Sequence, residues 1–472
     1  MTAPEPPRAD EGGAELDRAL GAWDATLLTI GAVVGTGIFL TAGDVARALP
    51  HPGLIVLVWI AAGVLTLAGA LTYAELGVMF PHAGGIYHFL KEAYGPLWGF
   101  LYGWTAFLVI NSGGIAAIAV GFGEYLGTFI PFFSGDRVLA SAAIGSWTWT
   151  LSGAQAAAVL AIAGLTAVNH FGLREGALTQ DLLTLARVAL LGVLIVAGLL
   201  APAGQPPALL APLPASASFA GLGLALIAAF WTFDGWYGAT LSAGELRRPE
   251  RTLPIGLTVG TAAVAVLYVL VNLVYIRAMP VATLGQTSRI GEAAAAALLG
   301  PIAGRAVALL VVLATFGCLA STILYTSRLY LPMARDGLFF RSVGRVHPRY
   351  RTPVASLWAQ SGWSALLTIS GTYSQLYTYA IFAGLLFHVG TTASVFVLRR
   401  TRPAAPRPYR TWGYPVTPAV FALASLALVA NTLHERPVES LIGLGLVALG
   451  LPAYLHWKAR PAGGRAHEGS LR

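Results

Sequence analysis

Long apolar stretches separated by short polar gaps run along almost the whole chain. Each stretch has room for the roughly 20 residues that a helix needs to cross the hydrocarbon core of a bilayer. The pattern therefore predicts an all-α polytopic membrane protein with 12 transmembrane helices. The predicted spans lie near residues 22–46, 53–79, 96–126, 153–170, 177–200, 217–243, 253–277, 302–333, 353–370, 374–398, 413–432 and 437–457.

The first and the sixth predicted spans are interrupted by sequence that does not favour a continuous helix. Residues 31–39 have the sequence GAVVGTGIF, and residues 230–236 have the sequence FWTFDGW. In hydrocarbon an unpaired backbone N–H or C=O group costs on the order of several kcal/mol, so a break survives only where it lines a cavity or holds a ligand. Two breaks in corresponding positions of two halves point to the binding site of a secondary transporter.

The second break comes five spans after the first, which implies a five-span unit used twice. Because a unit with an odd number of spans must be inverted when it is repeated, we expect a 5+5 inverted repeat with two further helices outside it. The expected division is a disordered tail (1–21), a first repeat (22–200), an extracellular linker (201–216), a second repeat (217–399), two added spans (400–458) and a second tail (459–472).

Composition and charge agree with a membrane protein. The chain of 472 residues is 56% hydrophobic and only 11% charged, whereas soluble domains carry about 25% charged residues. Of the 29 Lys and Arg residues, 21 lie in the two tails and the even-numbered gaps, which places both termini in the cytoplasm. The net charge of +8 is spread over several loops, so it indicates anionic lipid headgroups and not nucleic acid as the partner.

Sequence signatures of catalysis are absent. There is no His-Glu-x-x-His, no Gly-x-Ser-x-Gly and no P-loop, and lysine occurs only at positions 91 and 458. We therefore expect no enzyme activity, no cofactor and no metal. The one cysteine, Cys318, lies inside the eighth predicted span, so neither an internal disulfide nor a disulfide-linked subunit is expected. The acidic first twenty residues lack the basic region of a cleaved signal, so the first span is expected to stay.

The first break offers the chemistry that a zwitterion requires. The helix that restarts after Gly37 presents free N–H groups, which suit a carboxylate, and the half that ends at Val33 presents carbonyl groups, which suit an ammonium. Gly35 and Gly37 allow close approach to the backbone, and Thr36 adds a hydroxyl group. The alternative is a tight helix-packing site, because small residues are common at helix contacts in membranes.

The second break places Asp234 between bulky aromatic residues. An aspartate at the centre of a span costs roughly 2.5–3.5 kcal/mol and needs a cavity, a partner or a role. We expect carbonyl groups at Trp231 and Thr232 to contact the same ammonium, with Trp231 or Phe233 closing over the ligand. The alternative is that Asp234 only caps the restarting half-helix.

Arg187 lies about eleven residues into the fifth predicted span, and therefore roughly 16 Å deep at 1.5 Å per residue. Two readings remain open for its guanidinium, which must face the protein interior. It either replaces a bound cation by tying the first span to the eighth, or it forms an internal ion pair with Asp181 or Asp24. Arginine stays protonated at ordinary pH, so it is a poor proton carrier.

Weaker signals come from further polar residues in or near the spans. His388 is predicted to be a packed, hydrogen-bonded core residue. Asn111 and Ser112 either line the pocket or bond neighbouring helices. Asp44 and Glu75 are placed near the ends of the first two spans.

Several motifs together resemble the amino acid–polyamine–organocation (APC) permeases. They are GTGIF at 35–39, YAEL at 73–76 with PHAGGIY at 81–87, FDGW at 233–236 with AGE at 243–245 and PERTLP at 249–254, SR at 327–328 with ARDG at 334–337, and PYR at 408–410 with GYP at 413–415. Gln180-Asp181 followed by Arg187 is similar to the fifth span of the L-type amino acid transporter branch and its bacterial relatives. That branch usually has lysine where this chain has Arg187.

The resemblance implies a LeuT-like fold with broken helices 1 and 6. It also implies that Val33, Thr36 and Gly37 hold the backbone groups of the substrate together with Trp231, Thr232 and Asp234, and that Trp231 is a gating aromatic residue. The candidate substrate-binding residues are Val33, Gly35, Thr36, Gly37, Trp231, Thr232, Phe233, Asp234 and Gly235, with Arg187 as ion-site mimic and coupling residue. The external cysteine that links eukaryotic members to a glycoprotein partner is missing.

We therefore predict an amino acid permease of the inner (plasma) membrane that works by alternating access. Sodium-independent exchange or facilitated diffusion is expected, with an amino acid and the lipid bilayer as partners. The alternatives are a proton-coupled amino acid or polyamine symporter and, from another class, a non-transporting amino acid sensor.

Overall fold

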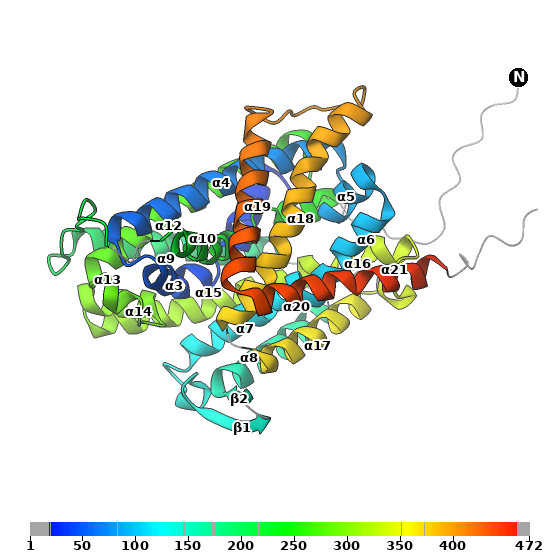
Figure 1. The fold of residues 1–472 in the computed structure, drawn as a ribbon. Coiled ribbons are helices and arrows are strands. Elements are labelled where there is room, and N and C mark those ends of the chain that lie inside the picture. Colours follow the sequence, from blue (N-terminus) through cyan, green and yellow to red (C-terminus); the bar gives the residue numbers. More distant parts are fainter. Residues whose placement is uncertain are drawn as a thin grey trace, which may run out of the picture.

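A computed structural model of the chain describes residues 18, 20–82, 84–144, 147–171, 176–214, 218–350, 352–371 and 373–459. Most of both predicted tails and the end of the 201–216 linker lie outside these residues, as do the side chains of Gln180 and Asp181. The described chain is mostly helical (Figure 1). Helix is present in every predicted apolar stretch, and eight helical runs among the described residues are long and apolar enough to cross a membrane.

The elements up to residue 200 begin with an interrupted helix and end with a long one. They are α1 (Ala22–Val33), α2 (Gly37–Leu40), α3 (Ala42–Ala48), α4 (Pro52–Met79), α5 (Ile86–Tyr94), α6 (Pro96–Thr105), η1 (Ala106–Ile110), α7 (Asn111–Leu126), η2 (Pro131–Phe133), β1 (Val138–Ile144), β2 (Trp147–Ser152), α8 (Gly153–His170) and α9 (Gly176–Leu200).

The later elements begin with the second interrupted helix. They are α10 (Phe219–Phe233), α11 (Gly238–Leu241), η3 (Ala243–Glu245), α12 (Pro249–Ala278), α13 (Val281–Leu284), α14 (Ile290–Leu299), α15 (Pro301–Ser327), α16 (Tyr330–Arg335), η4 (Arg341–Gly344), α17 (Val354–Ser370), α18 (Tyr373–Thr401), α19 (Val416–Glu435), α20 (Pro437–Ala448) and α21 (Gly450–Lys458).

The prediction of two interrupted helices is confirmed. Between α1 and α2 the chain leaves the helical conformation at Val34 (φ −75°, ψ 85°). Between α10 and α11 it does so at Asp234 (φ −58°, ψ 149°) and Gly235 (φ 94°), and the positive φ of Gly235 favours glycine at this position. Both breaks are buried in protein, which is where irregular backbone is tolerated inside a membrane.

The expectation of an all-α chain is wrong in one element. The strands β1 and β2 form an antiparallel hairpin between α7 and α8, with Ser141 opposite Thr150. The Trp149 indole N–H donates to the Ile369 carbonyl (2.7 Å) and so holds the hairpin against the end of α17. The sequence TWT at 148–150 alternates aromatic and polar residues with the period of a strand. This pattern is short, and the longer apolar stretches around it predict helices.

The first interrupted helix packs closely against the long helix α12. A Cβ atom at Gly256 would lie 2.7 Å from the Cβ of Ala25, and one at Gly260 would lie 2.8 Å from the Cβ of Thr29. Small residues at such contacts let two helix backbones approach in a membrane. The Tyr268 hydroxyl, also on α12, donates to the Val33 carbonyl (2.9 Å) and caps the end of α1.

The molecule has two ends, which we name by the elements that lie there (Figure 1). The α3 end carries α3 with α13 and α14, and the α5 end carries α5 and α16. At the α5 end, Leu20 pairs with Leu246 in a parallel bridge: the Leu20 N–H donates to Glu245 (3.0 Å) and the Arg247 N–H donates to Leu20 (2.8 Å).

An ion pair also closes the α5 end. Asp336 accepts from the Lys91 ammonium and from the Tyr87 hydroxyl, both at 2.5 Å. Burial, together with the hydrogen bond to Asp336, raises the pKa of Tyr87 far above its ordinary range. The Tyr87 hydroxyl therefore stays a donor at any physiological pH.

A buried carboxylate holds α4 to α18 near the α5 end. Glu75 is 1% exposed and accepts two hydrogen bonds from the Arg399 guanidinium (2.9 and 2.7 Å). It also accepts from the backbone N–H (2.7 Å) and the hydroxyl (2.8 Å) of Thr411. Glu75 thus lies near the end of its span, as the sequence predicts. Its carboxylate connects α4, α18 and the segment at Thr411, which are far apart in the chain.

Candidate functional site

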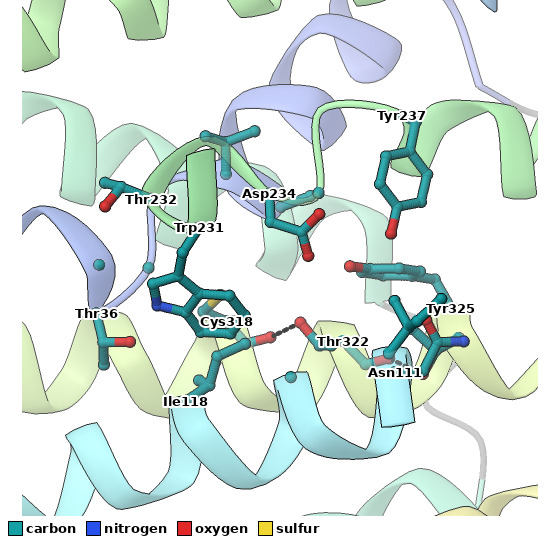
Figure 2. Close-up of a pocket in the computed structure, with 18 residues that line it drawn as sticks. Thr36, Asn111, Ile118, Trp231, Thr232, Asp234, Tyr237, Cys318, Thr322 and Tyr325 are labelled. Carbon is teal, nitrogen blue, oxygen red and sulfur yellow. Dashed lines mark hydrogen bonds between the residues drawn. The ribbon is translucent and has the colours of Figure 1, made fainter. Parts of the chain in front are cut away.

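A cavity of about 40 Å³ lies where the two interrupted helices meet (Figure 2). Four segments contribute to it: the break after α1, the break after α10, one face of α7 and one face of α15. Its lining residues are Ala32, Val33, Gly35, Thr36, Gly37, Ile110, Asn111, Gly114, Ile118, Trp231, Thr232, Asp234, Gly235, Tyr237, Cys318, Thr322, Tyr325 and Thr326.

At the first break, the hydroxyl group of Thr36 is buried and has no hydrogen-bond partner among the described residues. Helix α2 begins at Gly37, and in its first turn the Phe39 N–H already donates to the Thr36 carbonyl (3.0 Å), which leaves the Gly37 and Ile38 N–H groups without a backbone partner among the described residues. The Val33 carbonyl already accepts hydrogen bonds from the Gly35 N–H (2.8 Å) and from the Tyr268 hydroxyl. The Ala32 carbonyl instead faces the second break, because a Cβ atom added at Gly235 would lie 2.7 Å from its oxygen. The break thus places unpaired donors and a hydroxyl group at the cavity wall.

The two breaks touch each other at Gly37 and Thr232. A Cβ at Gly37 would lie 2.8 Å from the Cα of Thr232. The Thr232 hydroxyl is 2.5 Å from the hydroxyl of Thr41 and donates to the Ala228 carbonyl (3.0 Å). Glycine at position 37 is therefore what allows the two segments to meet.

At the second break, the Asp234 side chain belongs to the cavity wall. Figure 2 shows its carboxylate facing the same space as the rings of Tyr237 and Tyr325. The N-cap residue of α11 is Tyr237, whose side chain makes no cap hydrogen bond, so Asp234 is not the N-cap residue of the restarting helix. Among the described residues no cation forms an ion pair with this carboxylate.

Of the nine candidate residues, eight line the cavity and one does not. Phe233 points away from it and packs against Trp59 and Tyr268, with ring centroids 6.2 and 5.1 Å apart. Along α10, Trp231 lines the cavity and Phe233 two residues later lies on another side, as helical geometry requires.

Arg187 lies behind the first break and outside the cavity lining. It is 3% exposed, and its Nη1 donates to the Gly31 carbonyl (3.0 Å), while Nε and Nη2 have no partner among the described residues. The carboxylate of Asp24, one proposed ion-pair partner, instead accepts from the Gly21 N–H (2.6 Å). The arginine thus ties down the last turn of α1. Its proposed link to the eighth span and its proposed ion pair with Asp181, whose side chain lies outside the described residues, stay predictions.

The weaker sequence signals have mixed outcomes. His388 is buried and within 2.6 Å of the Tyr73 hydroxyl, which confirms a packed, hydrogen-bonded histidine. Asn111 lines the cavity and also donates to the Tyr330 hydroxyl (3.1 Å). The Ser112 hydroxyl donates to its own helix at Phe107 (2.6 Å) and is not among the lining residues.

The part of the wall that α15 contributes was not predicted from the sequence. Cys318, Thr322 and Thr326 line the cavity. They are spaced four residues apart and therefore share one face of the helix. This row of small, weakly polar residues in an otherwise apolar span is the signal that a search for breaks and charges passes over.

Comparison with known proteins gives the class and then the family. A model of the amino acid permease family matches residues 20–441. The serine/threonine exchanger SteT of Bacillus subtilis (strain 168) is 28% identical over 452 residues, covering 95% of this chain and 98% of SteT. The human large neutral amino acids transporter small subunit 2 is 29% identical (95% and 83% covered), and the human b(0,+)-type amino acid transporter 1 is 29% identical (94% and 89% covered).

Helices long enough to cross a bilayer and a cavity at two helix breaks define a polytopic transport protein of the membrane. The chain belongs to the amino acid permease family of the APC superfamily and is related to its L-type branch. The resemblance found in the sequence motifs is thereby confirmed.

Proposed function

We propose that this permease exchanges small, neutral, polar amino acids across the inner membrane, without sodium and by alternating access around the two breaks. The observation that carries the proposal is the cavity between Thr36–Gly37 and Trp231–Asp234. The Gly37 N–H group at the start of α2 and the Thr36 hydroxyl suit the substrate carboxylate. The Ala32 carbonyl and Asp234 suit its ammonium.

The size and polarity of the cavity favour a small substrate. A volume of about 40 Å³ corresponds to roughly three water positions, at 10–15 Å³ for each. Tyr237, Thr322 and Tyr325 line this space and suit a side chain that carries a hydroxyl group, although the Thr322 hydroxyl, which donates to the Cys318 carbonyl (2.8 Å), can only accept. The similarity to a serine/threonine exchanger supports the same substrate class.

The finer architecture is part of the proposal. The twelve predicted stretches are taken as 12 crossings, with residues 22–200 and 217–399 as LeuT-like inverted repeats and 400–458 as two added spans. The basic loops assign the α5 end to the cytoplasm and the α3 end to the outside. Arg187, at the end of α1, takes the place of a coupling ion, which is the reason to expect independence from sodium.

The test is exchange in proteoliposomes loaded with serine. We expect uptake of labelled serine only when serine or threonine is inside, with no change when sodium is replaced by choline. In a competition panel of the twenty amino acids, serine, threonine and alanine should compete, whereas phenylalanine and arginine should not. Uptake that requires a sodium or proton gradient, or binding without exchange, would overturn the proposal.

A further inference from the structure

Trp231 is held from behind by two tyrosines of α18. Its indole N–H donates to the Tyr373 hydroxyl (2.9 Å). Its ring stacks on that of Tyr377, with centroids 5.8 Å apart and planes 18° apart. Trp231 lines the cavity (Figure 2), whereas Tyr377, which stacks on its ring, is not among the lining residues.

Tyr377 is in turn bonded to the first interrupted helix. Its hydroxyl donates to Oδ2 of Asp44 on α3 (2.8 Å). Asp44 follows Gly37 by seven residues in the segment that begins at the first break. The same carboxylate accepts from the Arg47 guanidinium (2.7 Å). Arg47 also donates from Nε and Nη2 to the Gly285 carbonyl between α13 and α14 (3.1 and 2.8 Å).

These contacts differ in strength. Arg47 is 65% exposed and Asp44 is 23% exposed, so water and salt weaken their ion pair. Tyr377 is 4% exposed, so its hydroxyl is shielded from water, and a hydrogen bond from a hydroxyl to a carboxylate is among the stronger hydrogen bonds. The bond between Asp44 and Tyr377 is therefore the energetically important one in this series.

We propose that Asp44 is a positioning residue for transport: through Tyr377 it holds Trp231 over the substrate. When the outer part of the first interrupted helix closes onto α18, the Asp44 carboxylate meets the Tyr377 hydroxyl and the indole is fixed against the cavity. Outer closure and substrate enclosure then occur together. The inference rests on the proposed function, because it assigns Trp231 to the wall of an amino acid site.

The experiment compares Tyr377→Phe, Asp44→Ala and Asp44→Asn in serine exchange. Whole cells report the KM at the α3 end, and inside-out vesicles report the KM at the α5 end. Tyr377→Phe keeps the ring stack and loses only the hydrogen bond. We expect it, like Asp44→Ala, to raise the KM at the α3 end about tenfold with kcat changed less than twofold, and to leave the KM at the α5 end within twofold of wild type.

Three variants separate positioning from a merely structural role. Asp44→Asn still offers an oxygen to the Tyr377 hydroxyl, so we expect its KM to rise only about threefold. The double variant Asp44→Ala/Tyr377→Phe should match the single variants, since all three lose one bond. Arg47→Gln removes the exposed ion pair and the bonds to the Gly285 carbonyl but keeps the bond between Asp44 and Tyr377, so it should leave the KM within twofold of wild type.

The inference is overturned if the two single effects multiply in the double variant, or if the melting temperature falls while the KM is unchanged. If Tyr377→Phe does not fold, the comparison of Asp44→Asn with Asp44→Ala still tests the inference. Equal KM values for these two variants overturn the inference. Absence of serine exchange by the wild-type protein would instead refute the proposed function.

Discussion

Replacing Gly37 by alanine tests whether close contact of the two breaks forms the site. The added Cβ would lie 2.8 Å from the Cα of Thr232, 3.0 Å from its Oγ1 and 3.1 Å from its Cβ, and ordinary contact begins at 3.4 Å. The segments must therefore separate by about 0.6 Å at this point, the difference between 3.4 and 2.8 Å. Thr232 cannot yield freely, because its hydroxyl is bonded to Thr41 and to Ala228.

The size of the effect follows from two opposing terms. Overpacking of this kind costs about 1–3 kcal/mol. Alanine is at most about 1 kcal/mol better than glycine inside a helix, and less at the first residue of α2. A net cost of about 1–2 kcal/mol corresponds to roughly 5- to 30-fold weaker binding, because 1.4 kcal/mol is tenfold. We expect the KM for serine exchange in proteoliposomes to rise by this factor.

Other glycines provide matched controls. A Cβ at Gly35 would meet the Cys318 Sγ at 3.1 Å, a side-chain atom that can move, so Gly35→Ala should raise the KM only a few-fold. A Cβ at Gly164 or Gly362 has nothing within 4 Å, so alanine there should leave exchange unchanged. If Gly37→Ala exchanges serine with wild-type KM and kcat, the two breaks do not form the site together.

Two more substitutions test the surrounding network. Arg187→Ala should abolish most serine counterflow. Arg187→Lys should retain it, because a single donor reaches the Gly31 carbonyl in the native protein. Full transport by the alanine variant would contradict this role. Glu75→Gln should lower the free energy of unfolding by about 3 kcal/mol, because it removes the charged partner of Arg399 at a buried site. A melting temperature equal to that of the wild-type protein in detergent would show that this pair does not stabilise the fold.

The long helices were predictable from the sequence because a membrane span carries a strong and uniform signal. The ends of α4 and α12 agree with the predicted spans to within a few residues. Helix α5 was not foreseen: its nine residues are too short for a span, and its mixed sequence IYHFLKEAY resembles a loop between two apolar runs. Its helicity depends on packing against α6 and α18, which no local pattern contains.

In the candidate site, too, some features were predictable from the sequence and others depend on tertiary packing. Glycines and an aspartate inside apolar runs mark the two breaks without any knowledge of the fold, because they violate the rule for a continuous span. Tyr237 and Tyr325 were missed, because tyrosine is common in spans and only the packing of α11 and α15 turns these two toward the cavity. The position of Phe233 outside the lining was equally hidden, since a broken helix leaves the direction of each side chain open.

The contacts at the two ends of the cavity differ in kind, and this predicts which end opens first in the empty protein. At the α3 end Trp231 is stacked on Tyr377 away from water. At the α5 end the Lys91–Asp336 pair is 26% and 31% exposed, and such pairs contribute at most about 1 kcal/mol. Of these two contacts, the one at the α5 end, which we propose faces the cytoplasm, therefore costs less to open. Cys318 lines the cavity and is the one cysteine of the chain, so a membrane-impermeant maleimide should label it faster in inside-out vesicles than in whole cells. Faster labelling from outside would show that the exposed ion pair, and not the buried aromatic stack, is the stronger barrier.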